Sequence, residues 1–344
     1  MEIPFGEMLY LKQEDVIAAG GQDMLAAVAQ MERMLTLFDN KDCVDPPKSV
    51  LRWSDDPKVE NTRGRINFLS AYAGGDINAL GMKWIGSFPN NKKTLNLPRA
   101  TALIVLNDPD TGIPIAIMEG SVISATRTAA MTGVAVKCLA RSNSKVIGVI
   151  GAGVLSKAHL HVLDALLDKI EVIKLYNPTY ENGVKLKTEI EAETGLQVSL
   201  VDSAEAAFKG SDIVLTATTA HEPIVHSDWL SPGMLSIQIA GHEYSFNSVA
   251  KADKIVCDDW EGLKHRGIMT PAKMFEAGLL KDENIHANLG EIITGKKIGR
   301  KNDDEHIHFA TVGMGLSDVA IAAMVYQRAL KLDIGVRLPL WGNT

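Results

Sequence analysis

The sequence has few cysteines and no long apolar run. Only three of its 344 residues are cysteine, Cys43, Cys138 and Cys257, and they form no C-x-x-C pair. This pattern excludes a disulfide framework and a cysteine zinc site, so we expect reduced thiols and no bound metal. No apolar run reaches the roughly 18 residues that span a membrane, and the N-terminal residues do not resemble a secretion signal. We therefore expect a cytoplasmic protein without a membrane partner.

The chain also lacks an excess of positive charge. It has 35 Lys and Arg residues against 42 Asp and Glu residues, a net charge of -7, and no dense basic run. A protein that follows the phosphates of nucleic acid needs a basic surface, so we expect no nucleic-acid partner. With 46% hydrophobic residues, the chain is long enough for two domains that each bury a core.

The first 120 residues combine one helical pattern with several strand patterns. Residues Asp23 to Asp39 have helical periodicity, and short β-like runs occur at Val50–Trp53, Ala79–Phe88 and Thr101–Leu106. Strands that follow one another with few helices between them predict an α+β domain with an antiparallel or mixed sheet.

A second pattern begins after the alanine-rich helical segment that runs from Ser124 to Arg141. Short apolar strands then alternate with helical segments, which predicts a doubly wound parallel sheet. The expected strands are Lys145–Ile150, Val172–Tyr176, Val198–Val201, Ile213–Ala217, Met234–Ala240 and Lys254–Cys257, and the expected helices between them are Val154–Leu167, Asn182–Thr194 and Ser203–Lys209.

These patterns together predict the α/β class, with a Rossmann domain and an α+β domain built from both chain ends. We expect the helix Leu316–Lys331 to return to the first domain. The expected domains are residues 1–140 with 315–344, for substrate binding and dimerisation, and residues 141–314, for dinucleotide binding.

A glycine-rich loop follows the first strand of the alternating region. Gly151 and Gly153 permit a tight turn and close approach of the backbone to a pyrophosphate, and Ser156 stands where a third small residue is usual. A lone G-x-G-x-x-S is often only a helix-capping turn, but the strand before it and the helix after it favour a dinucleotide site. We expect the cofactor to contact Gly151, Gly153, Val154 and Leu155.

The sequence leaves the choice between NAD and NADP open. The second strand ends at Tyr176-Asn177-Pro178-Thr179, without the carboxylate that usually binds the ribose 2′-hydroxyl and without an adjacent Arg for a 2′-phosphate. Thr216, Ala217 and Thr218 end another strand at the carboxyl edge, where a cofactor ribose would pass, although a Thr-rich strand end has the same pattern. We expect both Asn177 and Thr179 to lie at the cofactor site.

Two cations are candidates for the reaction centre. Period-two alternation places Lys83 on the face opposite Met82 and Trp84, which is the solvent face of a half-buried strand. Alternatively, that face lines a cleft, where desolvation lowers the pKa of Lys83 and makes it a proton shuttle. Arg127 lies early in a long helix, where the dipole does not favour a cation, so it either binds a substrate carboxylate or belongs to a solvated face.

Several motifs in order along the chain resemble the ornithine cyclodeaminase/mu-crystallin superfamily. They are Lys83-Trp-Ile, Asn107-Asp-Pro-Asp-Thr-Gly112, Glu119-Gly-Ser121, Arg127-Thr-Ala-Ala130, the glycine loop and His308-Phe-Ala-Thr-Val-Gly313-Met-Gly-Leu-Ser-Asp318. Within it, Lys83-Trp-Ile-Gly-Ser-Phe-Pro89 and Pro98-Arg-Ala100 are most similar to the dehydrogenases of diaminopropionate and siderophore biosynthesis that act on N-(2-amino-2-carboxyethyl)-L-glutamate.

The resemblance implies a homodimer and a Rossmann domain that holds NAD(H) or NADP(H), with Gly313 and Met314 at the cofactor. It implies Lys83 as the acid and base beside the substrate amine and Arg127 on the substrate carboxylate. Lys48 or Arg52 is the implied second anion contact. Relatives have Arg where this chain has Lys48, and Lys lacks the planar fork of Arg.

Two positions depart from the cyclodeaminase pattern. Asn67 and His242 stand where ornithine cyclodeaminases have Glu and Asp. The chain therefore lacks the two acidic side chains of the cyclisation chemistry. His242 either handles a proton near neutral pH, which suits a dicarboxylic substrate, or is a structural histidine at a strand end.

We expect a nicotinamide-dependent dehydrogenase acting on the C–N bond of an amino acid or N-substituted amino acid. The substrate is expected to be N-(2-amino-2-carboxyethyl)-L-glutamate, which yields 2-oxoglutarate and 2,3-diaminopropionate. The alternatives are an ornithine cyclodeaminase or cyclic imine reductase, and a non-catalytic cofactor-dependent binding protein resembling mu-crystallin.

Overall fold

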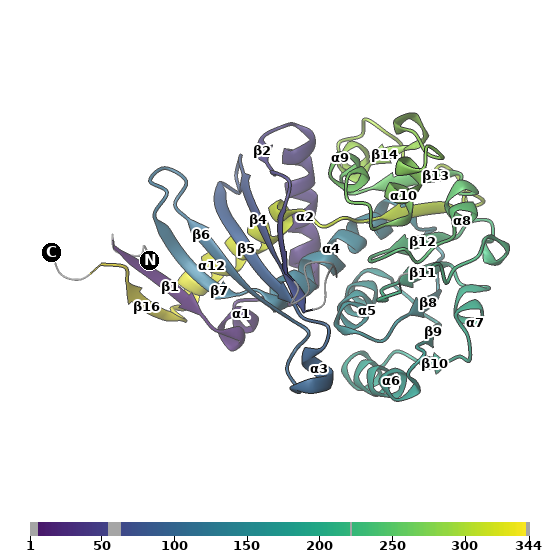
Figure 1. Cartoon of the computed structure of the whole chain (residues 1–344), viewed down its shortest axis with the longest axis horizontal. Helices are drawn as coiled ribbons and strands as arrows, with labels where there is room; N and C mark the ends of the chain where they lie inside the picture. The colour runs from purple at the N-terminus through teal and green to yellow at the C-terminus, as the bar shows by residue number, and fades with distance from the viewer. Residues whose placement is uncertain (1–5, 54–62, 221, 342–344) are drawn as a thin grey trace. The chain divides into compact units, whose positions relative to one another are not determined.

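The computed structural model describes residues 6–53, 63–220 and 222–341 (Figure 1). The chain divides into two compact units, Met1–Arg127 with Met314–Thr344, and Thr128–Gly313. The first boundary falls inside helix α4 (Ser121–Leu139), whereas the sequence places it after residue 140. An uninterrupted helix gives no break in periodicity, so its pattern cannot mark where one unit ends. Within the described residues, no helix combines the length and apolar character needed to cross a bilayer.

The described residues of the first unit form one mixed sheet of eight strands. Its order is β16-β1-β7-β6-β5-β4-β2, with β3 paired to β4, and all pairs are antiparallel except β1 with β7. The strands are β1 (Glu7–Leu11), β2 (Cys43–Val44), β3 (Ser49–Trp53), β4 (Gly64–Ala73), β5 (Ala79–Ser87), β6 (Ala100–Asn107), β7 (Pro114–Glu119) and β16 (Val336–Pro339). This is the mixed sheet that the sequence predicts.

Helices of this unit cover one face of the sheet. Helix α12 (Gly315–Leu332) runs across β4, β5 and β6, and α2 (Met24–Asp39) packs beside it (Figure 1). The covered face contributes Leu69, Ile104 and Met118 to the core. Because strand side chains alternate, the residues between these positions lie on the other face. Two short helices, α1 (Gln13–Ala18) and α3 (Asn91–Thr94), complete the unit.

The second unit is the doubly wound parallel sheet that the sequence predicts. Its described strands run in the order β10-β9-β8-β11-β12-β15-β13-β14, and every pair is parallel. They are β8 (Val146–Ile150), β9 (Val172–Tyr176), β10 (Val198–Leu200), β11 (Ile213–Thr216), β12 (Leu235–Gln238), β13 (Lys254–Cys257), β14 (Ala287–Asn288) and β15 (Ile307–Ala310).

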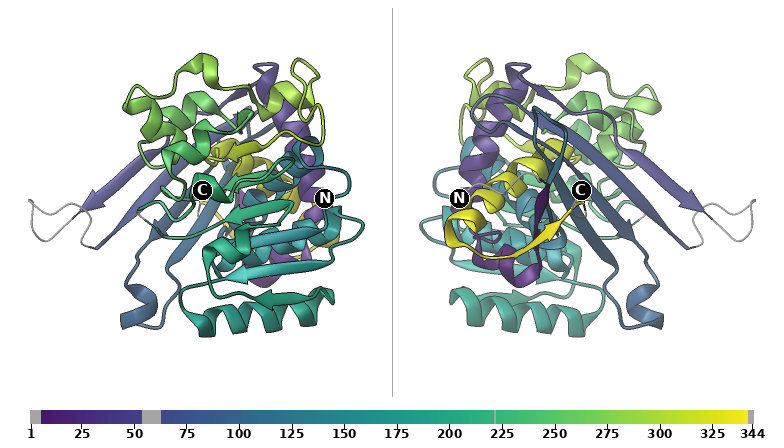
Figure 2. Two further views of the ribbon diagram at one scale, coloured as in Figure 1. Left: turned by 90° about the vertical axis from the view of Figure 1, so that its right-hand side faces the viewer. Right: turned by 90° about the vertical axis from the view of Figure 1, so that its left-hand side faces the viewer.

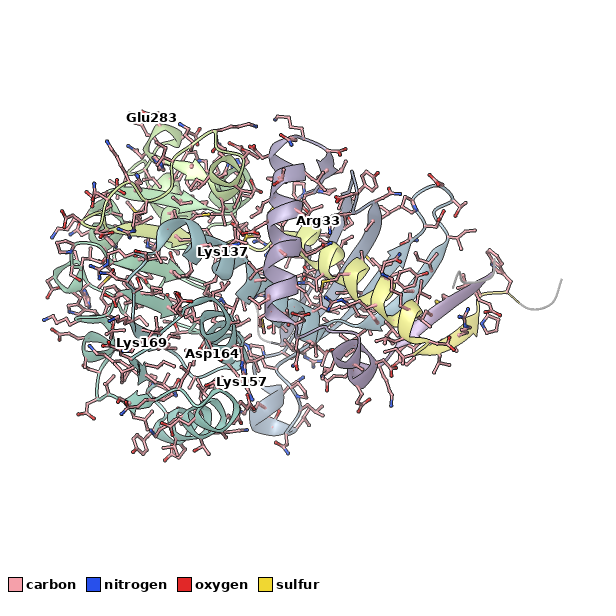
Figure 3. All side chains as sticks on the ribbon, turned by 180° about the vertical axis from the view of Figure 1, so that it is seen from behind. Arg33, Lys137, Lys157, Asp164, Lys169 and Glu283 are labelled. Carbon is pink, nitrogen blue, oxygen red and sulfur yellow. The ribbon has the colours of Figure 1, made fainter. Side chains whose placement is uncertain are left out.

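Helices connect these strands, as parallel pairing requires. They are α5 (Val154–Leu166), α6 (Tyr180–Thr194), α7 (Ala204–Phe208), α8 (Phe246–Ala250), α9 (Trp260–Lys264), α10 (Thr270–Glu276) and α11 (Leu289–Ile293), with 3-10 turns at Ser227–Trp229 and Asp282–Asn284. Helix α6 packs beside the edge strand β10 (Figure 2). Lys157 of α5 forms ion pairs with Glu189 and Glu193 of α6, so two successive helices are joined at the surface (Figure 3).

Strand β15 was not expected from the sequence. It lies between β12 and β13, and its run Ile307-His-Phe-Ala310 contains a histidine. His308 is fully buried, and its Nδ1 lies 3.1 Å from the hydroxyl of Ser236 on β12. Burial lowers the pKa of His308 to about 3, so the ring is neutral and compatible with the interior. A buried neutral histidine interrupts the apolar run that would otherwise mark a strand.

Candidate functional site

Four polar side chains of the first unit meet at Lys83. The Nζ atom of Lys83 lies 2.6 Å from Oδ2 of Asp318 and donates to the hydroxyl of Ser124 at 3.2 Å. Arg127 donates from Nε to Oδ1 of the same Asp318 at 2.9 Å. Strand β5, helix α4 and the first turn of α12 therefore bring two cations to one carboxylate.

The orientation of Lys83 differs from the solvent-facing alternative. Its side chain is opposite Trp84, as alternation predicts, but Lys83 is 1% exposed and Trp84 is 48% exposed. The lysine face of β5 is the face that packs against α12. The alternation was thus predicted correctly, while the assignment of the lysine face to solvent was wrong because both faces of this strand carry apolar residues.

Asp318 explains how two cations are tolerated at this depth. A buried charge is strongly unfavourable unless it is paired, and Asp318, itself fully buried, pairs with both Lys83 and Arg127. The sequence analysis quoted Asp318 within a motif but gave it no role. An acidic residue in the first turn of a helix is the signal that was available, although such residues often serve only the helix dipole.

Arg127 uses one guanidinium nitrogen on Asp318. Its side chain is 12% exposed, and the described residues offer its two terminal nitrogens no further hydrogen-bond partner. Those nitrogens form the planar fork that binds a carboxylate through two parallel hydrogen bonds. The ion pair with Asp318 therefore orients Arg127 and leaves its fork available to an anion.

Asn67 lies on the same face of the sheet as Lys83. It is on β4 two positions from Leu69, which is directly opposite Lys83, and its buried Oδ1 has no hydrogen-bond partner among the described residues. A buried acceptor without a donor is rare and points to a missing polar partner. Of the other expected anion contacts, Arg52 lies on β3 opposite Arg65, and Lys48 precedes β3.

The glycine loop of the second unit has the conformation that a dinucleotide loop requires. Gly151 has a φ of +110°, and a Cβ there would lie 2.6 Å from the carbonyl oxygen of Ala217, so only glycine fits without strain. Ser156 donates to the Gly151 carbonyl at 2.7 Å, while the space around Gly153 is open.

Helix α5 starts at this loop without a side-chain cap. Its N-cap is Gly153, whereas Ser203, Ser245 and Asp259 each cap a later helix of the unit through a side-chain oxygen. Val154, the first residue of α5, is 75% exposed. Uncapped N–H groups at an exposed helix start bind phosphate, so these residues fit a pyrophosphate group.

Asn177 and Thr179 adjoin the same loop. The Asn177 carboxamide accepts from the Ala152 amide at 3.0 Å and donates to the Thr179 carbonyl at 2.7 Å. It therefore ties the end of β9 to the glycine loop. This carboxamide carries no charge, and the geometry agrees with either NAD or NADP as the nucleotide.

The end of β11 is held by a buried carboxyl group. Glu243 accepts from the Thr216 hydroxyl at 2.7 Å and from the Thr218 amide at 2.6 Å. Burial raises the pKa of Glu243 to about 7, although these hydrogen bonds oppose the shift. Thr216 is fully buried, so its hydroxyl serves this internal contact. No role for Glu243 was expected from the sequence.

His242 is half-buried, and its Nδ1 lies 3.2 Å from the hydroxyl of Thr270. Burial, and then the charge of Lys273, lower the pKa of His242 below the usual histidine value. The amide of Gly313 donates to the buried Asp258 at 3.1 Å, which fixes the segment before Met314. This geometry is compatible with both a structural and a catalytic role for His242.

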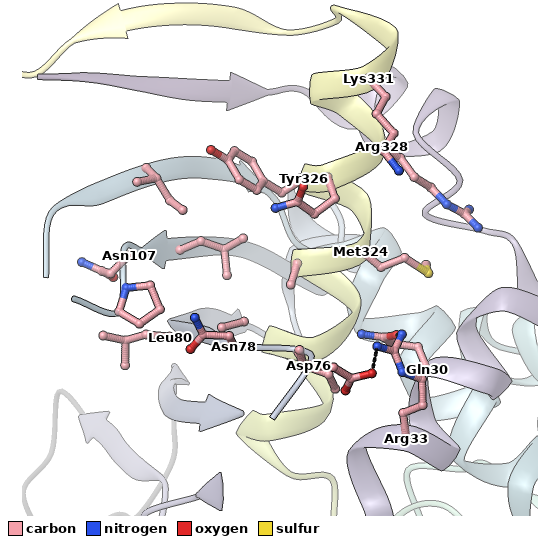
Figure 4. A pocket seen from close by; sticks show the side chains of 17 residues that line it. Gln30, Arg33, Asp76, Asn78, Leu80, Asn107, Met324, Tyr326, Arg328 and Lys331 are labelled. Atoms are coloured by element: carbon pink, nitrogen blue, oxygen red, sulfur yellow. Dashed lines mark hydrogen bonds and ion pairs between the residues drawn. The ribbon is translucent and has the colours of Figure 1, made fainter. Parts of the chain in front are cut away.

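A surface hollow on the first unit lies elsewhere. It is lined by residues of α2, α12 and the β4–β5 turn, including Arg33, Asp76 and Arg328 (Figure 4). None of the candidate site residues lines it. Among the residues with described placement, no group of three or more His, Cys, Asp and Glu side chains could hold a metal ion.

Comparisons with known proteins agree across nearly the whole chain. The model of the ornithine cyclodeaminase/mu-crystallin family matches residues 15–333. The chain is 33% identical to N-((2S)-2-amino-2-carboxyethyl)-L-glutamate dehydrogenase of Staphylococcus aureus, covering 97% of this chain and 99% of that protein. It is 32% identical to alanine dehydrogenase of Archaeoglobus fulgidus, covering 96% and 98%.

Two solved structures share the fold. Thermococcus litoralis Δ1-pyrroline-2-carboxylate reductase, in complex with NADH and L-proline, has a TM-score of 0.87 and 32% identity, covering 96% of this chain and 99% of that chain. An archaeal alanine dehydrogenase dimer with bound NAD has a TM-score of 0.88 and 31% identity, covering 97% and 100%. The chain belongs to the ornithine cyclodeaminase/mu-crystallin family.

Proposed function

We propose that this protein is a nicotinamide-dependent oxidoreductase that acts on the C–N bond of an amino acid. The observation that carries the proposal is the buried Lys83–Asp318–Arg127 cluster, which combines a proton-carrying amine with a carboxylate-binding fork. The uncapped start of α5 and the open space at Gly153 support a dinucleotide. The two similar solved structures contain NAD or NADH.

The chemistry divides between the cofactor and the cluster. When bound, the nicotinamide ring supplies the hydride acceptor for oxidation or the donor for reduction. Arg127 holds the substrate carboxylate and so fixes the carbon beside it. Oxidation of the CH–NH group gives a C=N group, which water then splits into a 2-oxo acid and an amine. Lys83 is the group that moves protons at the nitrogen and at the attacking water.

Asp318 controls the proton on Lys83. Its Oδ2 lies 2.6 Å from Nζ, and the Ser124 hydroxyl accepts from the same nitrogen. Both contacts hold Nζ at one position, as a proton shuttle requires. Asn67 offers its unsatisfied Oδ1 on the same face, where it can accept an N–H of the substrate.

For the substrate, we propose N-(2-amino-2-carboxyethyl)-L-glutamate, which is split into 2-oxoglutarate and 2,3-diaminopropionate. The similarity to the S. aureus dehydrogenase of that name, over almost the full length of both chains, supports this choice. The product diaminopropionate would then serve siderophore biosynthesis. An uncharged Asn67 in place of a glutamate also argues against a substrate that brings a second ammonium group to this position.

A second candidate is reduction of a cyclic imine. The similarity to Δ1-pyrroline-2-carboxylate reductase at 32% identity favours it specifically. Ornithine cyclodeamination is less compatible with the loss of the two acids at Asn67 and His242. A non-catalytic binding protein would have no use for a buried lysine with an orienting carboxylate.

Absorbance at 340 nm tests these candidates together. The protein is incubated with NAD or NADP and, separately, N-(2-amino-2-carboxyethyl)-L-glutamate, alanine, ornithine and proline. We expect reduced cofactor to accumulate with the first substrate, and 2-oxoglutarate to appear in equal amount. Reduction of the cofactor with proline, and with none of the other three substrates, would establish the imine-reductase alternative. An absence of hydride transfer with any amino or imino acid contradicts the proposal.

We further propose that two copies pair through the sheet face opposite the cluster. Phe68, Trp84 and Leu103 form one row across β4, β5 and β6, and the Phe68 and Trp84 rings stack with centroids 6.0 Å apart. Trp84 and Leu103 remain 48% and 39% exposed. A contiguous exposed apolar patch is typical of an interface, and the similar archaeal structure is a dimer.

A further inference from the structure

Three arginines of the first unit lie close together at one end of its sheet. Arg52 of β3 is directly opposite Arg65 of β4, and Arg65 is directly opposite Ser87 of β5. Ser87 pairs in turn with Ala100, the first residue of β6, which Arg99 precedes. Like charges directly opposite each other destabilise a sheet unless an anion lies near them.

Arg65 has the surroundings of a cation that lacks its anion. Its Nε is buried without a hydrogen-bond partner, and neither Arg65 nor Arg99 forms an ion pair with a residue that the structure describes. Burial, followed by the charges of Arg52 and Arg99, lowers the pKa of the Arg65 guanidinium. Arg65 therefore has cationic neighbours and a buried guanidinium nitrogen that remains unsatisfied.

The arginine pair lies on the same face of the sheet as the reaction cluster. Every second residue of β4 lies on one face of the sheet, and on this face are Arg65, Asn67 and Leu69. Leu69 is directly opposite Lys83. Four residues of strand separate the row of Arg65 from the row of Lys83, or roughly 13 Å between backbones. Arginine and lysine side chains each reach several ångströms, so a small extended molecule bridges the two positions.

We propose that Arg52 and Arg65 form a second anion subsite that binds the far carboxylate of a dicarboxylic substrate. This inference rests on the proposed function and specifies it. The carboxylate next to the reacting carbon is held by Arg127, and the γ-carboxylate of the 2-oxoglutarate skeleton reaches the arginine pair. The unsatisfied Asn67 lies between them, at the level of the substrate nitrogen.

The proposed subsite favours a dicarboxylic substrate over a monocarboxylic one such as alanine. A monocarboxylic substrate leaves Arg65 without its anion, whereas a dicarboxylic substrate supplies charge-assisted hydrogen bonds to it. A site built to bind a polar group rejects the analogue that lacks the group more strongly than an apolar pocket rejects a change of size. Arg65 is thus a specificity-determining residue.

Paired 2-oxo acids test the subsite in the reductive direction. The full chain receives reduced cofactor, 2,3-diaminopropionate, and either 2-oxoglutarate or 2-oxopentanoate, which has a methyl group in place of the far carboxylate. Condensation releases water, and reduction of the C=N group consumes one reduced cofactor and one proton. The readout is the ratio of the two kcat/KM values in the wild type, Arg65→Gln, Arg65→Lys and Arg52→Gln.

We expect Arg65→Gln to lower that ratio by about tenfold or more, through KM for 2-oxoglutarate, with 2-oxopentanoate unaffected. Arg65→Lys should restore part of the preference, because it keeps the charge without the fork. Arg33→Gln is the matched control, since Arg33 is a surface arginine paired with Asp76. Circular dichroism verifies folding, and Arg52→Gln gives an independent variant if Arg65→Gln does not fold.

The outcomes distinguish the subsite from the proposed function. A wild type that reduces neither condensate contradicts the proposed function. Calorimetric titration of 2-oxoglutarate into the full chain with cofactor then still tests the subsite, because Arg65→Gln must weaken that binding about tenfold. An unchanged substrate ratio in both arginine variants, or equal binding of the two oxo acids by the wild type, overturns the subsite.

Discussion

At the scale of single residues, Asp318 determines the charge balance of the proposed reaction centre. It is fully buried and pairs with Lys83 and Arg127. Removing a carboxylate from a buried ion cluster leaves its cations uncompensated, which is more destabilising than removing a cation together with its partner. The same carboxylate holds Lys83, the proposed proton shuttle, in place, so we expect Asp318 to affect both stability and activity.

We expect Asp318→Ala to lower the free energy of unfolding by about 3–5 kcal/mol. The additional substitution Lys83→Met should recover part of this loss, because it removes one uncompensated charge. Urea unfolding of the two single variants and the double variant measures the coupling. Additive effects would show that Lys83 and Asp318 do not interact.

The two loop glycines have different roles, which gives a matched pair of substitutions. Gly151→Ala places a Cβ 2.6 Å from the Ala217 carbonyl at a φ of +110°, and we expect a loss of roughly 1–3 kcal/mol in unfolding free energy. Gly153→Ala meets no atom within 4 Å, so its stability should change by less than about 0.5 kcal/mol.

The same two substitutions should rank in the opposite order in their effect on nucleotide binding. The methyl group of Gly153→Ala enters the space proposed for the pyrophosphate, so the Kd for reduced cofactor, measured by fluorescence titration, should rise about tenfold or more. If Gly153→Ala binds cofactor normally, the pyrophosphate does not lie at this helix start.

At the scale of elements, the alternation of strands and helices in the second unit was predictable from sequence. Buried parallel strands such as β8 and β9 are short apolar runs, and their expected and observed bounds agree closely. Strand β15 was not predictable in the same way, because a buried neutral His308 interrupts its pattern.

The candidate site could be predicted only in part. Lys83 and Arg127 were identified from their local sequence, but their common partner Asp318 lies 191 positions beyond Arg127. No local pattern reveals which distant carboxylate joins two cations. The buried side of β5 was also not predictable, because Trp84 and its neighbours give the outer face an apolar character as well.

The carboxyl group that holds the end of β11 can be tested through the pH dependence of stability. Glu243 has a pKa of about 7 in the folded chain against 4.5 ordinarily, so the folded state retains a proton that the unfolded state has lost. Its contribution to stability is full below about pH 4.5 and declines as the pH rises to about 7. We expect Glu243→Gln to remove this decline, which is on the order of 3 kcal/mol.

Urea unfolding between pH 4.5 and 8 measures this difference, with Glu181→Gln on the exposed start of α6 as the control. The stability of Glu243→Gln relative to the wild type should increase with pH, while the control follows the wild type. Parallel curves for Glu243→Gln and the wild type would show that Glu243 is ionised in both states.

At the scale of the whole molecule, the apolar row of Phe68, Trp84 and Leu103 predicts the assembly. We expect Trp84→Glu to give a monomer by size-exclusion chromatography with light scattering, because it places an unpaired charge at the proposed interface. Leu279→Glu, at a more exposed apolar position of the second unit, should leave the assembly unchanged. A Trp84→Glu variant of unaltered mass would move the interface to another surface.

The discontinuous first unit also affects the order of events during synthesis. Lys83 and Arg127 are made early, but Asp318 belongs to the segment that begins at Met314. A chain emerging from the ribosome completes Thr128–Gly313 before the first sheet receives helix α12. Until then the two cations have no carboxylate between them, and the sheet lacks the helix that covers it. A nascent chain therefore completes the proposed reaction centre only after residues 128–313 have been made.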